Sequence, residues 1–345
     1  MVRHRPTYIV GLALTWLVAV VARSAHGDDA LERFYKGRQM SVVIYSEAGS
    51  TYDLYARLLA RHMGQHIPGA PTLIPQNMPG AGGLKATEFL YSMAPKDGSV
   101  IGTISRSIPF ETLLGVHHVA FEPLKVTWLG SMNRESAAAV AWHTVPVKTI
   151  DDLRARELIV PGTGAGSDTE LLPRAFNELI GTRFKVISGY SGSTRASLAM
   201  ERGEVEGAGY ITWGGLTTNQ PGWVRDGMVT ILFKTGGSDP RLAEVPDVRD
   251  FARTDTDRQA LDLILAREVL GRPFLAPPGL PPERARALTA AFDATMTDPA
   301  LLADARKARA DIDPVSGDEI VALLKRVFEY PEATIARAKE ALSRK

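Results

Sequence analysis

Short apolar segments alternate with amphipathic ones along the chain, and this order restricts the fold more than any other feature. Residues 40–45 (MSVVIY), 72–76 and 100–104 are predicted to be strands. The segment after the first strand spaces its leucines as an amphipathic helix does, and a second helix is expected at 84–91. Because parallel strands need crossover helices, this β-α-β-α-β order predicts a parallel sheet with helices on its faces.

A second α/β unit follows the first. Its strands are expected at 137–142, 158–160, 184–187 and 206–211, and its helices at 171–180 and 195–202. A strand expected at 229–233 would carry the chain back to the first unit. From Pro281 onward the spacing of apolar residues is helical. The sequence thus predicts two α/β units and no short repeat.

The first 27 residues have the features of an export signal. Arg3 and Arg5 make a basic start, and residues 9–21 are uncharged and apolar but too short to span a bilayer comfortably. Ala25-His26-Gly27 places small residues where a signal peptidase reads them. We therefore predict a signal peptide over residues 1–27, cut after Gly27 or alternatively after Ala25, and a periplasmic protein. A retained membrane anchor is the alternative.

Composition excludes several classes of function. The chain has no cysteine, which excludes thiol catalysis, thiolate metal sites and disulfides. Loss of residues 1–27 would remove three of the 40 basic residues and none of the 39 acidic ones, so the net charge would be about −2. A chain with this balance has no electrostatic footprint for nucleic acid. We expect no nucleic-acid partner.

Glycine-rich loops precede three of the expected helices, which suggests sites for an anion. In parallel α/β sheets, ligands bind beyond the carboxyl ends of the strands, where helices begin with unpaired amides. The alternative is structural, with Ser50 or Thr51 as a helix cap and Asp53 favouring the helix dipole. The candidate ligand-binding residues of these loops are Ser46, Ala48, Gly49, Ser50, Thr51, Tyr52 and Asp53; Gly162, Thr163, Gly164, Ala165, Gly166 and Ser167; and Tyr190, Gly192 and Ser193.

Three further residues complete the candidate site. Ser105 and Arg106 close the third strand, where a fixed guanidinium could pair with a carboxylate. Trp213 could pack on the apolar part of a ligand, or it could belong to the core. The alternative for Arg106 is a solvated loop residue.

Motifs of other chemistries are incomplete in this sequence. The run GTGAGS has Ser167 where the dinucleotide fingerprint needs its last glycine, and no phosphate loop or G-x-S-x-G elbow occurs. His62 and His66 have the spacing of zinc ligands, but Met63 stands where a metalloprotease carries its glutamate. We therefore expect no catalytic residue, no metal and no cofactor.

The order of several motifs resembles one known family. These motifs are VVIYSEAGSTYDLYARLLARHMG, PQNMPGAGG, APKDGSVIG, GTGAGSDTELL, GYSGS, ERGEVEG and DPRLAEVPDVRDF, followed by FLAPPGLPPERARALTAAFDATMTDPAL. Together they resemble the substrate-binding proteins of tripartite tricarboxylate transporters, the Bug family of extracytoplasmic solute receptors. The likeness covers nearly all of the chain after residue 27.

This resemblance implies a type II-like periplasmic binding protein with two hinged domains, parallel-rich sheets and a cleft of the Venus-flytrap kind. We expect domain 1 to comprise residues 28–138 plus 228–345, and domain 2 to comprise residues 139–227, joined by two crossings. The implied function is to bind a small organic carboxylate and deliver it to the membrane permease. The receptor would be a monomer and not an enzyme. The alternatives are a hydrolase-like enzyme on the same scaffold, or a partner of a membrane sensor.

The chain departs from the pattern of the family at three positions. The first loop has Gly49 then Ser50 where the family has two glycines, Glu47 adds a negative charge, and Ser191 stands where a lysine is common. Less positive charge therefore lines the expected cleft than a tricarboxylate would favour. This predicts a monocarboxylate, or a ligand with an amino or amide group that could meet Glu47.

Overall fold

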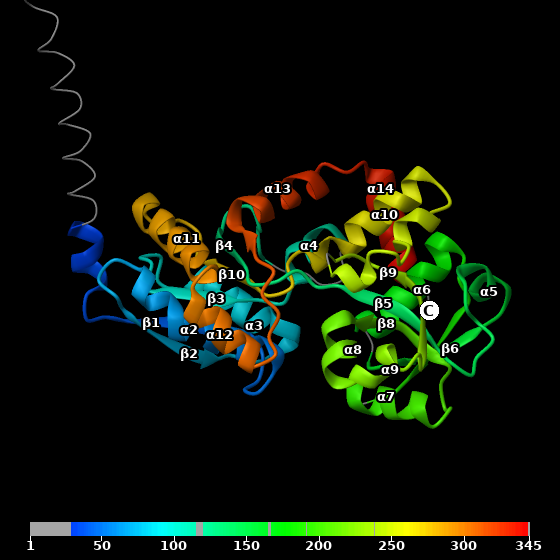
Figure 1. Ribbon diagram of the computed structural model, residues 1–345. Helices are drawn as coiled ribbons and strands as arrows, with labels where there is room; N and C mark the ends of the chain where they lie inside the picture. The colour runs from blue at the N-terminus through cyan, green and yellow to red at the C-terminus, as the bar shows by residue number, and fades with distance from the viewer. Residues whose placement is uncertain (1–28, 115–119, 165–166, 191, 238, 344–345) are drawn as a thin grey trace, which may run out of the picture.

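The computed structural model describes residues 29–114, 120–164, 167–190, 192–237 and 239–343. Two lobes lie side by side, one built mainly from the blue, cyan and orange parts of the chain and the other from the green and yellow parts (Figure 1). The expected α/β class is confirmed, because sheets flanked by helices form both lobes.

The first lobe contains a six-stranded sheet in the order β11-β4-β10-β3-β1-β2. Its strands are β1 (Gln39–Ile44), β2 (Thr72–Asn77), β3 (Val100–Thr103), β4 (Thr127–Ser131), β10 (Pro273–Ala276) and β11 (Val315–Ser316). Strand β1 pairs in parallel with β2 and with β3, as the β-α-β-α-β order predicts. The other half of the sheet is antiparallel, since β10 pairs with both β3 and β4. The sheet is therefore mixed, whereas a parallel-rich sheet was expected.

The second lobe combines a three-stranded sheet in the order β8-β5-β9 with a parallel pair, β6 and β7. Its strands are β5 (Ala137–Trp142), β6 (Leu158–Gly162), β7 (Phe184–Ser188), β8 (Gly207–Thr212) and β9 (Val229–Lys234). Strand β5 is buried along its whole length and pairs antiparallel with β8 and β9. The backbone amide of Glu206 donates to the carbonyl of Ile159, which joins the two sheets.

Strand β9 lies in the second lobe, which differs from the expectation that it returns the chain to the first. Its Phe233 is fully buried between Phe176 and Phe184, so the strand completes the core of this lobe. The chain rejoins the six-stranded sheet only at β10. The expected boundary at residue 228 therefore falls before a strand that pairs within the second lobe.

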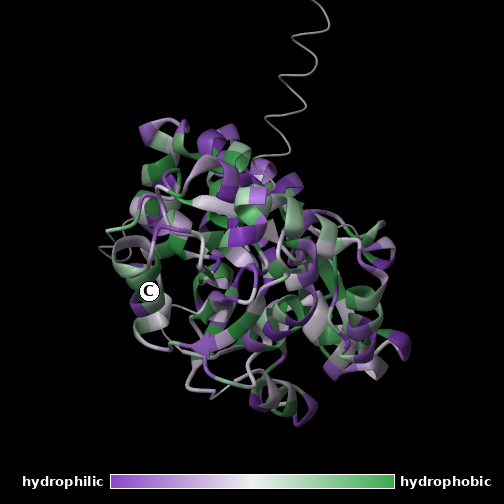
Figure 2. Ribbon diagram, turned by 90° about the vertical axis from the view of Figure 1, so that its left-hand side faces the viewer, coloured by the Kyte–Doolittle hydropathy of each residue, from purple (hydrophilic) through white to green (hydrophobic). Residues whose placement is uncertain are grey.

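Helices flank the sheets of both lobes, and Figure 2 shows hydrophilic and hydrophobic residues alternating along many of these helices. The α-helices are α2 (Thr51–His62), α3 (Leu84–Glu88), α4 (Ile108–Leu114), α5 (Ile150–Ala155), α6 (Asp168–Ile180), α7 (Ser193–Glu201), α8 (Trp213–Asn219), α9 (Pro221–Arg225), α10 (Asp255–Leu265), α11 (Pro282–Met296), α12 (Pro299–Lys307), α13 (Gly317–Phe328) and α14 (Glu332–Ser343). The shorter helices are η1 (Met63–His66), η2 (Ala81–Gly83), η3 (Phe89–Met93), η4 (Pro240–Leu242), η5 (Val248–Phe251) and η6 (Ala266–Glu268). None of the helices in the described part of the chain has the length and apolar character needed to cross a membrane.

Within the described residues, three segments cross between the lobes, whereas the sequence predicted two. The first joins β4 to β5 and the second joins η6 to β10. These two are hydrogen-bonded to each other, since the amide of Met132 donates to Arg272 O (3.0 Å) and that of Glu135 donates to Glu268 O (2.7 Å). The third runs from α13, which packs on β4, to α14, which packs on α6 and α10. Paired crossings of this kind are suited to act as a hinge.

The burial of Phe233 leads to a test of the lobe assignment. Replacing Phe233 with alanine should lower the free energy of unfolding by about 3–5 kcal/mol, because it removes a large buried ring and leaves a cavity. Thr230→Ala on the same strand is the control and should cost about 1 kcal/mol or less. Urea denaturation followed by circular dichroism measures both losses. Equal losses for the two variants would contradict the position of β9 in a packed core.

Candidate functional site

The carboxyl ends of β1, β2 and β3 meet at one edge of the six-stranded sheet. Tyr45 follows β1, and its ring packs edge-to-face on that of Tyr52 in α2, with centroids 4.6 Å apart. Gly83, the last residue of η2 in the connection after β2, lies so close to Tyr45 and Ser105 that a β-carbon there would meet the tyrosine ring at 2.8 Å. Its φ of +101° also favours glycine. The three loops of this edge are thus packed together, as the topology predicts.

The first glycine-rich loop is partly held by its own helix. The Ser50 hydroxyl caps α2 by accepting from the amide of Asp53 (3.2 Å), and the Asp53 carboxylate accepts from the amide of Gly49 (2.9 Å). Burial would raise the pKa of Asp53, but its hydrogen bonds from Arg57, Gly49 and Asn77 lower it to about 2. The Asp53 carboxylate therefore already accepts the hydrogen bond of the Gly49 amide. This agrees with the alternative in which the loop caps its own helix.

Two amides at the start of α2 remain available. In the part of the chain that the structure describes, no protein group accepts a hydrogen bond from the backbone amides of Thr51 and Tyr52. Both belong to the first turn of a twelve-residue helix, where the helix dipole favours a negative charge. The anion-binding capacity of this loop therefore lies at Thr51 and Tyr52 and not at Gly49.

The loop after β6 shows the same arrangement in the second lobe. The amide of Gly164 donates to Glu170 Oε1 (3.0 Å), and the amide of Thr163 donates to Thr169 Oγ1 (3.0 Å). The loop after β7 lies beside it, since the amide of Tyr190 donates to the carbonyl of Gly162 (3.2 Å). The parallel pairing of β6 and β7 brings both loops to one edge. Ala165 and Gly166 lie outside the described residues.

Arg106 joins the two lobes. It follows β3 in the first lobe, and its Nη2 lies 2.5 Å from Oδ2 of Asp168, the first residue of α6 in the second lobe. The same Nη2 lies 3.3 Å from the hydroxyl of Tyr210 on β8. Only 12% of the Arg106 side chain is exposed. The alternative of a solvated loop arginine is therefore wrong.

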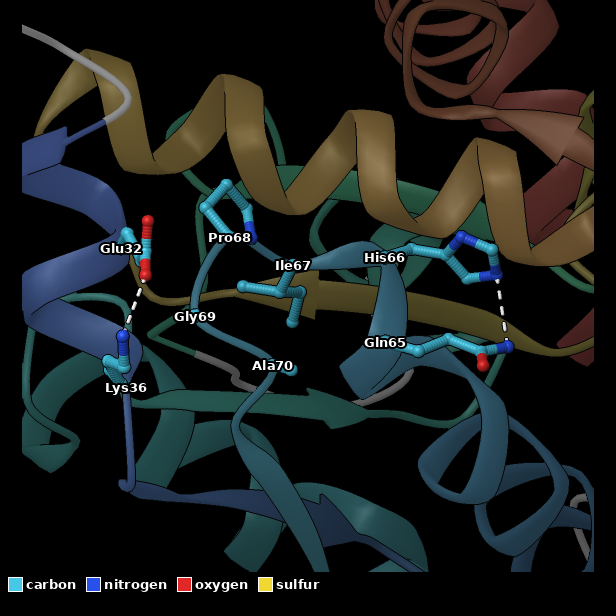
Figure 3. Close-up of a pocket in the computed structure, with 8 residues that line it drawn as sticks. All are labelled: Glu32, Lys36, Gln65, His66, Ile67, Pro68, Gly69 and Ala70. Atoms are coloured by element: carbon cyan, nitrogen blue, oxygen red, sulfur yellow. Dashed lines mark hydrogen bonds and ion pairs between the residues drawn. The ribbon is translucent and has the colours of Figure 1, made fainter.

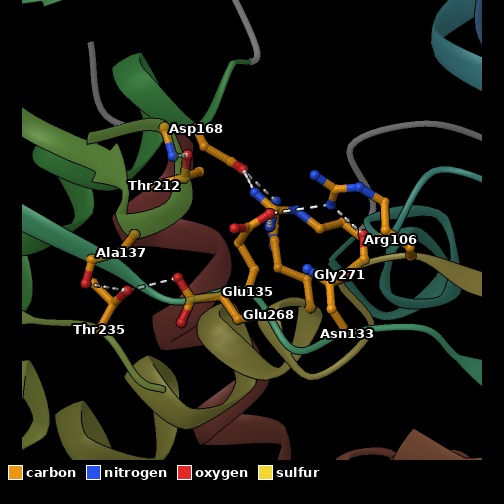
Figure 4. Close-up of polar contacts among 12 residues, drawn as sticks. Arg106, Asn133, Glu135, Ala137, Asp168, Thr212, Thr235, Glu268 and Gly271 are labelled. Atoms are coloured by element: carbon orange, nitrogen blue, oxygen red, sulfur yellow. Dashed lines mark hydrogen bonds and ion pairs between the residues drawn. The ribbon is translucent and has the colours of Figure 1, made fainter. Parts of the chain in front are cut away.

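Arg106 belongs to a group of charged residues that we call the interlobe ion cluster (Figure 4). Oε2 of Glu135 lies 3.0 Å from Arg272 Nη1 and 3.5 Å from Arg106 Nη1, while Arg267 lies 3.4 Å from Asp168. Arg272 also stacks over the ring of Tyr52, 4.6 Å from its centroid, which connects the cluster to α2. The cluster consists of Arg106, Glu135, Asp168, Arg267, Glu268 and Arg272.

Glu268 lies at the inner end of the cluster, on the second crossing. Its Oε1 accepts from Thr235 Oγ1 (2.6 Å) and from the hydroxyl of Tyr210 (3.0 Å). Burial raises the pKa of Glu268 to about 8, although Thr235, Arg106 and Tyr210 act in the opposite direction. At neutral pH this carboxyl is therefore mostly protonated. Burial would also raise the pKa of Asp168, but Arg106 and Arg267 hold it below its ordinary value.

Trp213 lies at the start of α8, where its backbone amide donates to the carbonyl of Ser136 (2.7 Å). Its indole N–H donates to Asp239 Oδ2 (2.6 Å), and the guanidinium of Arg241 lies 5.1 Å from its ring centroid. Because the side chain is buried and already has these partners, its geometry favours the core alternative over ligand contact.

The sequence predicted Tyr52, Ser105 and Arg106, and the structure brings them together at the edge of the first sheet. The sequence analysis missed four charged residues at the crossings, namely Glu135, Arg267, Glu268 and Arg272. A signal was present in LILAREVLGRPFLA, where three charged residues interrupt an apolar stretch. Charged residues in such a setting are seldom buried unless they are paired.

A separate hollow of about 570 Å³ opens on the surface of the first lobe (Figure 3). It is lined by Glu32, Lys36, Gln65, His66, Ile67, Pro68, Gly69 and Ala70. None of these residues belongs to the interlobe ion cluster, and Glu32 and Lys36 already form an ion pair (3.0 Å). The hollow therefore lies away from the candidate site.

The two histidines with zinc-like spacing have separate partners. His62 lies 3.1 Å from Asp304, and His66 lies 3.0 Å from Asp298. Among the described residues, no group of three His, Asp or Glu side chains could hold a metal ion. Both histidines instead connect the helix pair α2 and η1 to α12 and the turn before it.

Comparison with known proteins identifies the family. The family described as tripartite tricarboxylate transporter family receptor matches residues 55–324. No curated protein matches the chain. A TctC solute binding protein from Polaromonas, solved without ligand, has a similar fold with a TM-score of 0.69 at 18% identity, over 89% of this chain and 98% of that one.

Two structures from Rhodopseudomonas palustris are also similar in fold. MatC with bound malate has a TM-score of 0.58 at 19% identity, over 89% of this chain and 99% of that one. A second protein, with adipate, has a TM-score of 0.58 at 19% identity, over 88% of this chain and 96% of that one. Since the family match spans well over half of its length, this chain belongs to the tripartite tricarboxylate transporter family of receptors.

Proposed function

We propose that this protein is a periplasmic receptor that binds a small organic carboxylate between its two lobes and delivers it to the membrane subunits of a tripartite transporter. The family match supports the receptor role, and the malate and adipate held by two proteins of similar fold support the class of ligand. We also propose that residues 1–27 are a signal peptide that directs export to the periplasm. The exported receptor would be a monomer.

The observation that carries the proposal is the guanidinium of Arg106. It lies at the carboxyl end of β3, faces the start of α6, and keeps its buried Nη1 without a hydrogen-bond partner in the described part of the chain. A buried donor of this kind is costly unless a ligand satisfies it. The amides of Thr51 and Tyr52 supply further donors on the same side, because Tyr52 lies against Arg272 in the cluster.

Binding of the carboxylate would favour closure of the two lobes about the hinge. A carboxylate held by α2 and Arg106 in the first lobe and by the start of α6 in the second contacts both lobes only when they are close together. The ligand therefore favours the closed arrangement by its additional contacts there. We propose that the ligand is surrounded by residues of four loops, namely Ser46–Asp53, Ser105–Arg106, Gly162–Gly164 with Ser167, and Tyr190 with Gly192 and Ser193.

A thermal-shift screen of small organic acids tests the proposal. A ligand present at about 100 times its dissociation constant should stabilise the folded state by about 2.7 kcal/mol, which corresponds to a rise in Tm of roughly 4 °C for a chain of this size. Recovery of the acid unchanged after prolonged incubation would distinguish a receptor from an enzyme. If no carboxylate raises the Tm, the proposed function is wrong.

The role of the α2 amides has its own test. Thr51→Pro removes one amide at the first position of α2, where proline is well tolerated, and Ser50 already has the extended backbone that a residue before proline needs (φ −71°, ψ 165°). We expect carboxylate affinity to fall about tenfold while the Tm without ligand changes little. Thr51→Ala, which keeps the amide, is the control and should bind normally. Calorimetric titration measures both, and equal affinity of the two variants would exclude the Thr51 amide from the site.

A further inference from the structure

The interlobe ion cluster already contains a carboxylate in a ligand-like position. Oδ2 of Asp168 lies 2.5 Å from Arg106 Nη2, and Oδ1 lies 3.4 Å from Arg267 Nη1. Both guanidiniums are almost buried, with 12% and 7% of their side chains exposed. A carboxylate held between two such groups is charge-neutralised and hydrogen-bonded as a bound organic acid would be. Asp168 therefore uses part of the anion-binding capacity of the cluster.

The formal charges of the interlobe ion cluster can neutralise about one further anionic group. The cluster has three guanidiniums, Arg106, Arg267 and Arg272, and two carboxylates that form ion pairs with them, Glu135 and Asp168. The third carboxyl, Glu268, is mostly protonated at neutral pH because burial raises its pKa to about 8. Burial raises the pKa of the facing Tyr210 well above its ordinary value, so its hydroxyl adds no charge. The net charge of the cluster is therefore +1.

The unsatisfied hydrogen bonds of the cluster agree with this count. Among the described residues, Oε2 of Glu268 has no hydrogen-bond partner, and neither do two buried guanidinium nitrogens, Arg106 Nη1 and Arg272 Nε. Their guanidiniums are neighbours, since both lie within 3.5 Å of Oε2 of Glu135. One carboxylate group, with two acceptor oxygens, can receive two donors. The second carboxylate of a dicarboxylate ligand would face Asp168 and Glu135, and no unpaired guanidinium would remain in the cluster to neutralise it.

We propose that this receptor selects acids with a single carboxylate, and that Asp168 is the residue that excludes acids with two. The repulsive group is part of the selectivity, because a site discriminates as much by what it repels as by what it attracts. A monocarboxylate brings the charge of the cluster to zero, whereas a dicarboxylate brings it to −1 in a poorly solvated place. This inference rests on the proposed function and names its class of substrate.

Paired acids of equal length provide the test. The intact protein is titrated calorimetrically with butyrate and succinate, and with hexanoate and adipate, so that each pair differs only in the second carboxylate. We expect the monocarboxylate of at least one pair to bind at least tenfold more tightly than its dicarboxylate. In Asp168→Asn, which frees Arg106 and raises the charge of the cluster to +2, this ratio should fall at least tenfold or reverse.

Two further variants keep the result interpretable. Asp226→Asn makes the same chemical change in an exposed pair with Arg225 and should leave the ratio unchanged. Asp168→Ser, with a small residue that suits a helix start, gives a second reading if the asparagine variant folds poorly. Dicarboxylates that bind the unaltered protein as tightly as monocarboxylates, or an unchanged ratio in both Asp168 variants, would overturn the inference alone. Absence of binding by all four acids would count against the proposed function itself.

Discussion

Replacing Arg106 with glutamine is expected to weaken carboxylate binding by about 100-fold or more. Truncating one partner of a buried, hydrogen-bonded charge pair typically costs 2–5 kcal/mol, and each 1.4 kcal/mol is a tenfold change in affinity. Arg106 would lose both its contact with the ligand and its link to Asp168, which lies in the opposite lobe. The same change should also weaken the contact between the lobes when no ligand is present. Calorimetric titration with the best acid from the thermal-shift screen measures the loss.

Two variants make this result specific. Arg106→Lys keeps the charge but loses the planar fork, so it should recover only part of the affinity. Arg134→Gln removes a guanidinium from the same crossing that carries Glu135, but Arg134 pairs with Asp313 and Glu319 outside the cluster. It should bind the acid normally. Wild-type affinity in Arg106→Gln would remove the interlobe ion cluster from the binding site.

The parts of the fold that could be predicted are those with strong local patterns. Strands β1, β2 and β3 are separated by helices, and their order alone gives the parallel half of the first sheet. Strands β4 and β10 were missed because they pair antiparallel with each other across a long separation in sequence, and because Gly130, at φ +153°, interrupts β4 where its register with β10 shifts. Short strands of this kind depend on tertiary pairing, which local composition does not show.

The candidate site also contains residues that could be predicted from local sequence and residues that could not. Arg106 could be predicted because the end of β3 is visible in the sequence and carboxyl ends of parallel strands meet at one edge. Its partners could not, since Glu135 and Arg272 come from two crossings that are far apart in the chain and are paired only in the folded protein. The glycine-rich loops were found, but the amides of Gly49 and Gly164 proved to be occupied by Asp53 and Glu170. Each of these carboxylates is the third residue of its helix, which is a readable sign of self-capping.

The charged side chains at the crossings add a means of ligand recognition that the glycine-rich loops do not provide. Backbone amides alone would carry little information on the identity of a ligand. The interlobe ion cluster adds charged side chains at fixed positions, and we propose that their charges distinguish acids by the number of carboxylates. The crossings supply three of these residues, Glu135, Glu268 and Arg272, so the hinge and the candidate binding site share side chains. A change of charge at the hinge should therefore alter stability as well as binding.

Glu268→Gln should make the protein more stable than the wild type at alkaline pH and should remove a pH dependence of stability. The folded-state pKa of Glu268 is about 8, against an ordinary value of 4.5, so folding takes up a proton between these values. The unfolded chain binds fewer protons there, and wild-type stability therefore falls as pH rises through this window, by up to about 1.4 kcal/mol per pH unit. Glutamine imitates the protonated form, because its carbonyl can still accept from Thr235 and Tyr210.

Urea denaturation of both proteins at pH 5, 6, 7, 8 and 9 measures this effect as a difference between two stability curves. The advantage of Glu268→Gln should be small at pH 5, should grow to roughly 3–4 kcal/mol by pH 8, and should then level off. Other titrating groups are common to both proteins and cancel in the difference. Glu244→Gln, at an exposed position, controls for the loss of one acidic residue and should give a flat difference curve. A flat curve for Glu268→Gln as well would mean that this carboxyl is ionised in the folded protein, and the charge of the interlobe ion cluster would then be zero before any ligand binds.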